Sequence, residues 1–166
     1  MMELELRRTD HDRRLYALES VGTVRLSGLG SRTGTAEAGG RSWRIGRRGV
    51  WQRTIVATDE SGTEVGEFEP RSVHRGGTLR WAGRELRLRP ASAWRERYAL
   101  ADGERELVVL DGKSWGRSPV KVTVEDPQSL EAGLLLFAAF VVRGLAADAG
   151  ASAAAGASVA ATGGGG

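Results

Sequence analysis

The sequence predicts a mainly β protein: a closed antiparallel up-and-down β-barrel of about 12 strands around a buried hydrophobic C-terminal α-helix. Three observations predict it. Apolar and polar residues alternate through most of residues 3–125, as half-buried strands require. Short turn signals separate the alternating runs, so consecutive strands are expected to pair as hairpins. A single long apolar stretch, SLEAGLLLFAAFVVRGLAAD at residues 129–148, follows all of them.

The strand region is a series of short alternating runs. Their apolar positions are Leu4 and Leu6, Val24 and Leu26, Trp43 and Ile45, Leu79 and Trp81, Leu86 and Leu88, and Val120, Val122 and Val124. Glycine-containing turns are predicted at 59–62, 82–83, 101–103 and 110–112. An open sheet of this length would leave exposed edges, so closure is favoured. A barrel of about 12 strands is too wide for its own side chains to fill, so another element must occupy its centre.

The apolar stretch supplies that element. Asp126 and Pro127 suit the N-cap and first position of a helix, which we predict over 127–147. Apolar residues follow one another from Leu134 to Phe137 and therefore point in every direction, which is typical of a helix buried in protein or in lipid. Gly133 and Gly144 weaken this helix, which makes sense if they let strands pack closely.

The length of the stretch favours burial in protein. The uninterrupted apolar run, Ala132 to Val142, has eleven residues, and a membrane span needs about 20. We therefore expect no integral membrane insertion. The alternative is a tail-anchored or scramblase-like membrane protein that uses 130–149 as its anchor.

The composition predicts one domain and a tail. Residues 1–148 are expected to form the barrel domain, and residues 149–166, which contain almost only Ala, Gly and Ser, a disordered tail. The chain has no cysteine, which excludes disulfides and thiol chemistry. No secretory signal begins the sequence, so a cytoplasmic location is expected. All but two of the 24 basic residues are arginines spread among 21 acidic ones, which argues against nucleic-acid binding.

The order of elements resembles the tubby C-terminal-like superfamily, which includes LURP-one-related proteins and phospholipid scramblases. The stretches that carry the resemblance are GGRSWRIGRRGVWQRTIVATDESGTEVGEFEP, GGTLRWAGRELRLRP, WRERYALADGERELVVLDGKSWGRSPVKVTVE and DPQSLEAGLLLFAAFVV. Tubby-type members bind phosphoinositide headgroups through Lys and Arg, and scramblases respond to calcium. This chain has only Lys113 and Lys121 and no acidic calcium segment, so it is most similar to the compact LURP-one-related type.

The sequence offers little for catalysis. Its two histidines, His11 and His74, lie in predicted loops, and Asp10-His11-Asp12 fits a solvated turn better than a metal site. GLGSRTG at 28–34 has the wrong glycine spacing for a phosphate-binding loop and no helix after it. We therefore predict a protein that is not an enzyme, with no catalytic residue, metal or cofactor.

Arginine clusters are the best candidates for binding. The segment RSWRIGRRGVWQR places Arg41, Arg44, Arg47, Arg48 and Arg53 around Trp43 and Trp51, and a second set, Arg80, Arg84, Arg87 and Arg89, flanks Trp81. Guanidinium groups suit phosphate, and tryptophan suits a lipid interface. The composition favours the simpler alternative, in which the tryptophans face the core and Glu64, Glu67, Glu69 and Glu85 neutralise arginines on the barrel exterior.

Together these observations predict a small non-enzymatic binding or scaffold module of the LURP-one-related type. Its expected partners are anionic phospholipid headgroups, contacted through Arg41–Arg53, or another protein. We expect it in the cytoplasm, with a peripheral place at the membrane if the arginines bind headgroups.

Overall fold

A computed structural model describes residues 1–27, 32–49, 51–71 and 75–162. In this part of the chain twelve antiparallel strands form a closed barrel in which each strand pairs with its neighbours in sequence and β1 pairs with β12. The strands are β1 (Met2–Arg8), β2 (Leu15–Leu18), β3 (Gly22–Ser27), β4 (Thr33–Ala38), β5 (Arg41–Arg47), β6 (Ile55–Asp59), β7 (Glu64–Pro70), β8 (Gly77–Trp81), β9 (Arg84–Pro90), β10 (Arg97–Asp102), β11 (Arg105–Gly112) and β12 (Val120–Val124). The predicted fold class is confirmed.

The alternation in sequence sets which side chains face inward. On β12, Val120, Val122 and Val124 are fully buried, and the residues between them are partly exposed. Met2 to Leu6 of β1 pair with Val124 to Val120, so that this pairing closes the barrel. Because side chains on a strand point alternately to its two faces, the apolar half of each run lines the interior.

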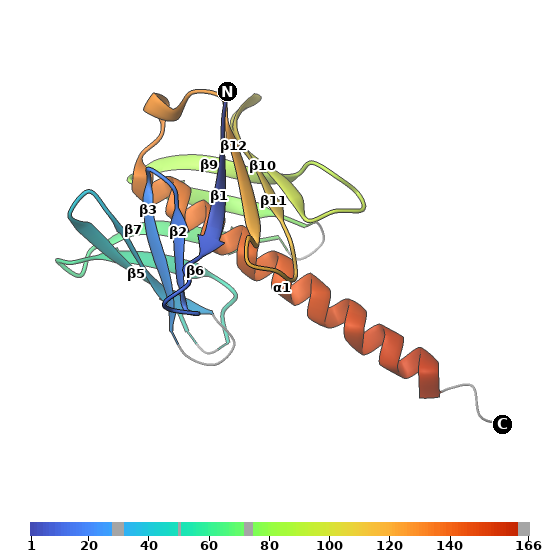
Figure 1. Ribbon diagram of the computed structural model, residues 1–166. Coiled ribbons are helices and arrows are strands. Elements are labelled where there is room, and N and C mark those ends of the chain that lie inside the picture. The colour runs from blue at the N-terminus through green and yellow to red at the C-terminus, as the bar shows by residue number, and fades with distance from the viewer. Residues whose placement is uncertain (28–31, 50, 72–74, 163–166) are drawn as a thin grey trace.

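The helix α1 (Ala132–Thr162) fills the barrel. Figure 1 shows it running through the ring of strands and projecting beyond them at the opposite side. The residues from Leu134 to Val142 are all buried. The inward positions of β4 are small, namely Gly34, Ala36 and Ala38, which leaves room for the helix. A Cβ on Gly34 would lie 3.1 Å from the Phe140 ring, so the two surfaces are in close contact.

The start of the helix differs from the prediction. Asp126 and Pro127 begin a separate short 3₁₀ turn, η1 (Pro127–Ser129), in which the Asp126 carboxylate accepts a hydrogen bond from the Gln128 N–H at 3.2 Å. Leu130 is extended and buried, and α1 begins only at Ala132. The chain must reverse from β12 into the barrel at this point, and an uninterrupted helix from Pro127 would not make that bend.

The end of the helix also differs. The predicted helix stops at 147 and is followed by a disordered tail, whereas α1 continues to Thr162; residues 163–166 lie outside the described part. Helix nucleation is costly and propagation is not. The buried half of α1 provides the nucleus, and alanine, the best helix former, continues it despite the intervening Gly and Ser.

Candidate functional site

The two ends of the barrel are built differently. Six longer connections join strands at one end, which we call the loop end and define by its described residues: 9–14, 32, 48–49, 51–54, 71, 75–76, 91–96 and 113–119. The other end, the turn end, has the short connections 19–21, 39–40, 60–63, 82–83 and 103–104, together with segment 125–131 that leads into α1. The helix therefore begins at the turn end and leaves the barrel at the loop end, where Gly150 contacts Ser114.

Charge is divided between these ends. The loop-end connections carry ten basic residues, Arg13, Arg14, Arg32, Arg48, Arg53, Arg71, Arg75, Arg95, Lys113 and Arg117, and three acidic ones, Asp10, Asp12 and Glu96. The turn-end connections carry six acidic residues, Glu19, Glu60, Glu104, Glu125, Asp126 and Glu131, and no basic one. Although the net charge is only +3, the connections at the loop end are mainly basic and those at the turn end are acidic.

Exposed tryptophans share the loop end. Trp51, Trp94 and Trp115 are 96%, 95% and 81% exposed and lie in three different loop-end connections. Trp43 and Trp81 are buried inside the barrel. Of the exposed three, only Trp51 was singled out in the sequence. Trp94 and Trp115 could have been recognised because neither belongs to an alternating strand run.

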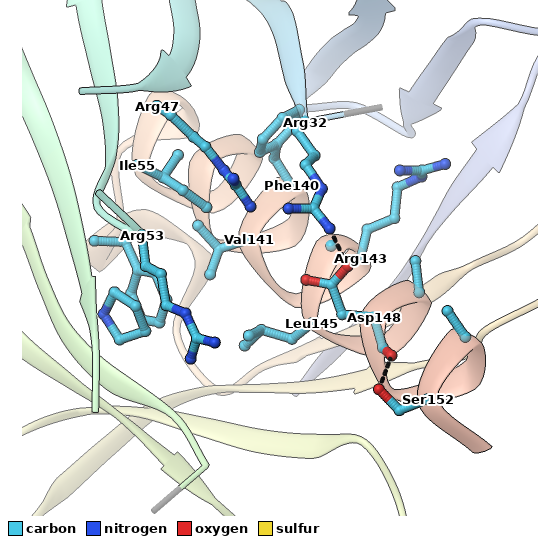
Figure 2. Close-up of a pocket in the computed structure, with 15 residues that line it drawn as sticks. Arg32, Arg47, Arg53, Ile55, Phe140, Val141, Arg143, Leu145, Asp148 and Ser152 are labelled. Atoms are coloured by element: carbon cyan, nitrogen blue, oxygen red, sulfur yellow. Dashed lines mark hydrogen bonds and ion pairs between the residues drawn. The ribbon is translucent and has the colours of Figure 1, made fainter. Parts of the chain in front are cut away.

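A pocket of about 490 Å³ opens where α1 leaves the barrel. Figure 2 shows Val141 and Leu145 of α1 beside Arg47 and Arg53, and we call the apolar lining of the pocket its floor. The floor consists of Ile55, Phe68, Pro70, Phe140, Val141 and Leu145, and the polar residues are Arg32, Arg47, Arg53, Arg143, Asp148 and Ser152. The site is thus amphipathic and basic.

Strand alternation explains why Arg47 reaches this pocket. Arg47 continues the inward-facing row of β5 that includes Trp43 and Ile45, and it pairs with Ile55 of β6. At the end of the strand an inward residue lies at the mouth of the barrel, where a charged group keeps access to water. Arg53 approaches the same pocket from the connection between β5 and β6.

The other two pocket arginines have partners. Arg32 Nη2 lies 3.1 Å from Asp148 Oδ1. The guanidinium of Arg143 lies over the ring of Tyr16, 5.3 Å from its centroid, and points away from Arg47 and Arg53 in Figure 2. No described residue forms an ion pair with Arg47, Arg53 or Arg143. Because Arg143 lies against Tyr16, Arg47 and Arg53 hold the uncompensated positive charge that faces the cavity.

The predicted cluster Arg41–Arg53 is divided by the barrel. Arg47 and Arg53 meet at the pocket, whereas Arg41 lies at the turn-end start of β5, 5.2 Å from the Trp43 ring. Arg44 is exposed on the outer wall. Arg48 also faces outward and pairs with Glu64 and with Glu67 at 2.6 Å, and the hydrogen bonds that its guanidinium donates to these carboxylates raise the pKa of Arg48.

The second arginine set lies on the barrel exterior among acidic residues. Arg80 contacts Glu67 at 2.7 Å and Glu85 at 3.2 Å, and Arg84 contacts Asp102 at 2.6 Å. Arg89 lies 3.6 Å from Glu104, and Arg87 is exposed. For Arg48 and Arg80 the structure agrees with the alternative interpretation, in which these glutamates neutralise arginines on the barrel exterior. Arg84 instead pairs with an aspartate that the interpretation did not include.

The two aspartates of the N-terminal loop form ion pairs of their own. Asp12 accepts a hydrogen bond from the Arg14 N–H at 2.8 Å and pairs with Arg25, and both interactions lower the pKa of Asp12. Asp10 pairs with Arg117 at 2.9 Å. Within the described residues no group of three acidic or histidine side chains is placed to hold a metal ion. His74 and residues 28–31 of the glycine-rich segment lie outside them.

The fold and the pocket define the class of protein: a twelve-stranded barrel with a central helix and a basic amphipathic pocket at the mouth from which the helix emerges. No protein-family model, curated protein or solved structure matches this chain.

Proposed function

We propose that the protein is a non-enzymatic binding module of the tubby-like, LURP-one-related kind, which attaches to anionic lipid surfaces through its loop end. The observation that carries the proposal is the placement of ten basic residues and three exposed tryptophans at the same end of the barrel. Near an anionic membrane each Lys or Arg contributes about 1 kcal/mol of attraction. Tryptophan favours the lipid–water interface.

The acidic turn end supports an orientation. Its six acidic residues would be repelled by the same surface, so the barrel would approach a membrane with the loop end first. Several loop-end arginines are also available for lipid. Arg13, Arg71 and Arg95 are exposed, and no described residue pairs with their side chains. Arg75 and Arg117 instead pair with Glu96 and Asp10.

The helix geometry favours this peripheral mode over the tail-anchored alternative. The segment Ala132–Gly156 is long and apolar enough to cross a membrane, but 61% of its most apolar window is buried inside the protein. The large apolar side chains of this segment, from Leu134 to Val142, are all buried inside the barrel. Crossing a membrane with this segment would therefore require residues of the barrel core to leave the barrel.

Vesicle co-sedimentation tests the proposal with two variants of equal charge change. Arg13, Arg71 and Arg95 are replaced by Glu in the first, and Arg44, Arg87 and Arg105, which are exposed on the wall or the turn-end side, in the second. We expect the native chain to bind phosphatidylcholine vesicles that contain phosphatidylserine, more weakly as salt rises. The first variant should lose binding, and the second should keep most of it.

A third variant, with Trp51, Trp94 and Trp115 replaced by Ser, should also bind weakly because it lacks the interfacial anchors. Equal binding by the two charge variants would refute docking by the loop end. Binding that survives carbonate extraction would favour the tail-anchored alternative.

A further inference from the structure

The pocket at the loop end has properties that a flat membrane-docking surface does not need. Two guanidinium groups, those of Arg47 and Arg53, face one cavity from β5 and from the following connection, and neither has an ion-pair partner among the described residues. The floor between them is apolar and includes Val141 and Leu145 of α1. Charge and apolar surface are thus combined in a space of about 490 Å³, within the range of small-molecule sites.

We propose that this pocket binds a single anionic amphiphile, with its carboxylate or phosphate head on Arg47 and Arg53 and its acyl chain along Val141 and Leu145. Paired guanidinium groups recognise such heads through charge-assisted hydrogen bonds. The apolar floor selects against inorganic phosphate, which would bury none of it. The two unpaired cations select against a neutral chain, which would leave them uncompensated in a partly enclosed site.

Gly144 supports the assignment independently. It lies in the interior of α1 and lines the pocket, and a Cβ built on it would meet no atom within 4 Å. Glycine in a helix interior costs about 1 kcal/mol relative to alanine. No packing contact in the described residues requires that cost, but a side chain here would project into the space that the ligand would occupy.

The neighbouring pair Arg32–Asp148 limits the charge of the site. Asp148 lies 3.1 Å from Arg32 and neutralises its guanidinium. A phosphate monoester head, with about −1.5 to −2 charges, balances most of the charge at Arg47 and Arg53, and a carboxylate head balances half of it. A ligand with one head is favoured over a polyanion.

Calorimetric titration of the full chain in solution tests the proposal without a membrane. The probes are octyl phosphate, octanoate, octanol and inorganic phosphate, all below micelle-forming concentrations. We expect one saturable site for the two anionic amphiphiles, and binding at least about tenfold weaker for octanol and phosphate. No saturable binding of either anionic amphiphile, or octanol binding equal to theirs, would overturn it.

Three variants locate the site. Gly144→Leu should abolish binding and keep the thermal stability, because leucine is a good helix former and nothing in the described structure obstructs it. Arg47→Gln and Arg53→Gln should each weaken binding by about tenfold, whereas the control Arg44→Gln, on the outer wall of the same strand, should not. Unchanged binding by Gly144→Leu, or by both pocket arginine variants, would refute the site.

Vesicle binding distinguishes the source of the ligand and separates this proposal from membrane docking. If octyl phosphate competes with vesicle association, the head comes from a membrane lipid; if it binds without competing, the ligand is a free amphiphile. The Gly144→Leu variant could lose octyl phosphate binding and still sediment with anionic vesicles. This result would support both proposals and would show that pocket binding and membrane docking are separate properties. Loss of vesicle docking in the loop-end charge variant says nothing against the pocket, because Arg47 and Arg53 are unchanged there.

Discussion

Gly133 lies against the indole ring of Trp81 so closely that no side chain fits between them. A Cβ on Gly133 would be 2.5 Å from Cζ2 of Trp81 and 2.9 Å from Cζ2 of Trp43. The two indoles are 5.8 Å apart in an edge-to-face arrangement, and Trp81 Nε1 donates to Glu131 at 3.0 Å. The tryptophans therefore fix the point at which α1 begins inside the barrel.

Gly133→Ala is expected to destabilise the protein even though alanine is the better helix former. The added methyl group meets buried rings that cannot move freely, and such overpacking costs typically 1–3 kcal/mol, more than the gain of about 1 kcal/mol in helix propensity. Gly144→Ala is the matched control and should stabilise by up to about 1 kcal/mol, since its Cβ meets nothing within 4 Å. Denaturant unfolding measures both. A Gly133→Ala variant as stable as Gly144→Ala would contradict the close packing.

The barrel is expected to depend on its central helix. A chain of residues 1–126 lacks Leu136, Phe137 and the other fully buried side chains of α1, each contributing about 2 kcal/mol of burial. A chain of residues 1–149 keeps them, and the removed residues 151–156 are exposed. We expect the longer chain to unfold cooperatively and the shorter one to aggregate, as judged by circular dichroism and gel filtration. Cooperative unfolding of 1–126 would show that the barrel does not require the helix.

Tyr98 provides a probe of the barrel interior at alkaline pH. Burial raises the pKa of Tyr98 well above its usual value, and a hydrogen bond from its hydroxyl to Glu96 adds to the effect. Because the folded-state pKa exceeds that of the unfolded chain, the stabilisation is complete below about pH 10 and is lost as the pH rises above it. Phenolate absorbance of the folded protein should show a late-titrating tyrosine that Tyr98→Phe removes. Unchanged titration in Tyr98→Phe would contradict this burial.

Asp59 should contribute stability that disappears in acid. Its carboxylate accepts hydrogen bonds from the Ser61 hydroxyl at 2.6 Å and from the Thr63 N–H at 2.9 Å in the turn after β6, and these bonds lower the pKa of Asp59. A lowered folded-state pKa stabilises the protein above the unfolded value of about 3.9, and the effect fades as the pH falls through the folded value. Asp59→Ala should therefore be less stable than the native chain at neutral pH.

The difference between the native chain and Asp59→Ala should shrink as the solution becomes more acidic than about pH 4. Glu125→Ala, an exposed carboxylate at the same end of the barrel, is the control and should change stability little. Thermal unfolding across the acidic range measures both variants. A difference that grows in acid would contradict the assigned role of Asp59.

Short sequence patterns predicted the wrong local structure at some glycines that lie in or next to the central helix. The LDG signal at 110–112 predicts a turn, but Gly112 ends β11. A Cβ there would lie 2.9 Å from the Ala146 Cβ, so the glycine admits α1 and does not reverse the chain. The glycine prediction for α1 was half right. Gly133 permits close packing against the Trp43 and Trp81 side chains of β5 and β8, whereas a Cβ on Gly144 would meet no described atom within 4 Å.

By itself the sequence determined the barrel and its filling. Alternation from residue 3 to 125 sets the inner face of each strand, and an apolar run that points in all directions can only be buried. Tertiary structure decided which residues meet. Closure brings three tryptophans and ten basic residues from six connections to one end, and it separates Arg47 from its neighbour Arg48. The physical reason is that successive connections in an up-and-down barrel lie at opposite ends. The end at which a loop lies therefore depends on the exact number of strands before it, and the sequence predicts that number only approximately.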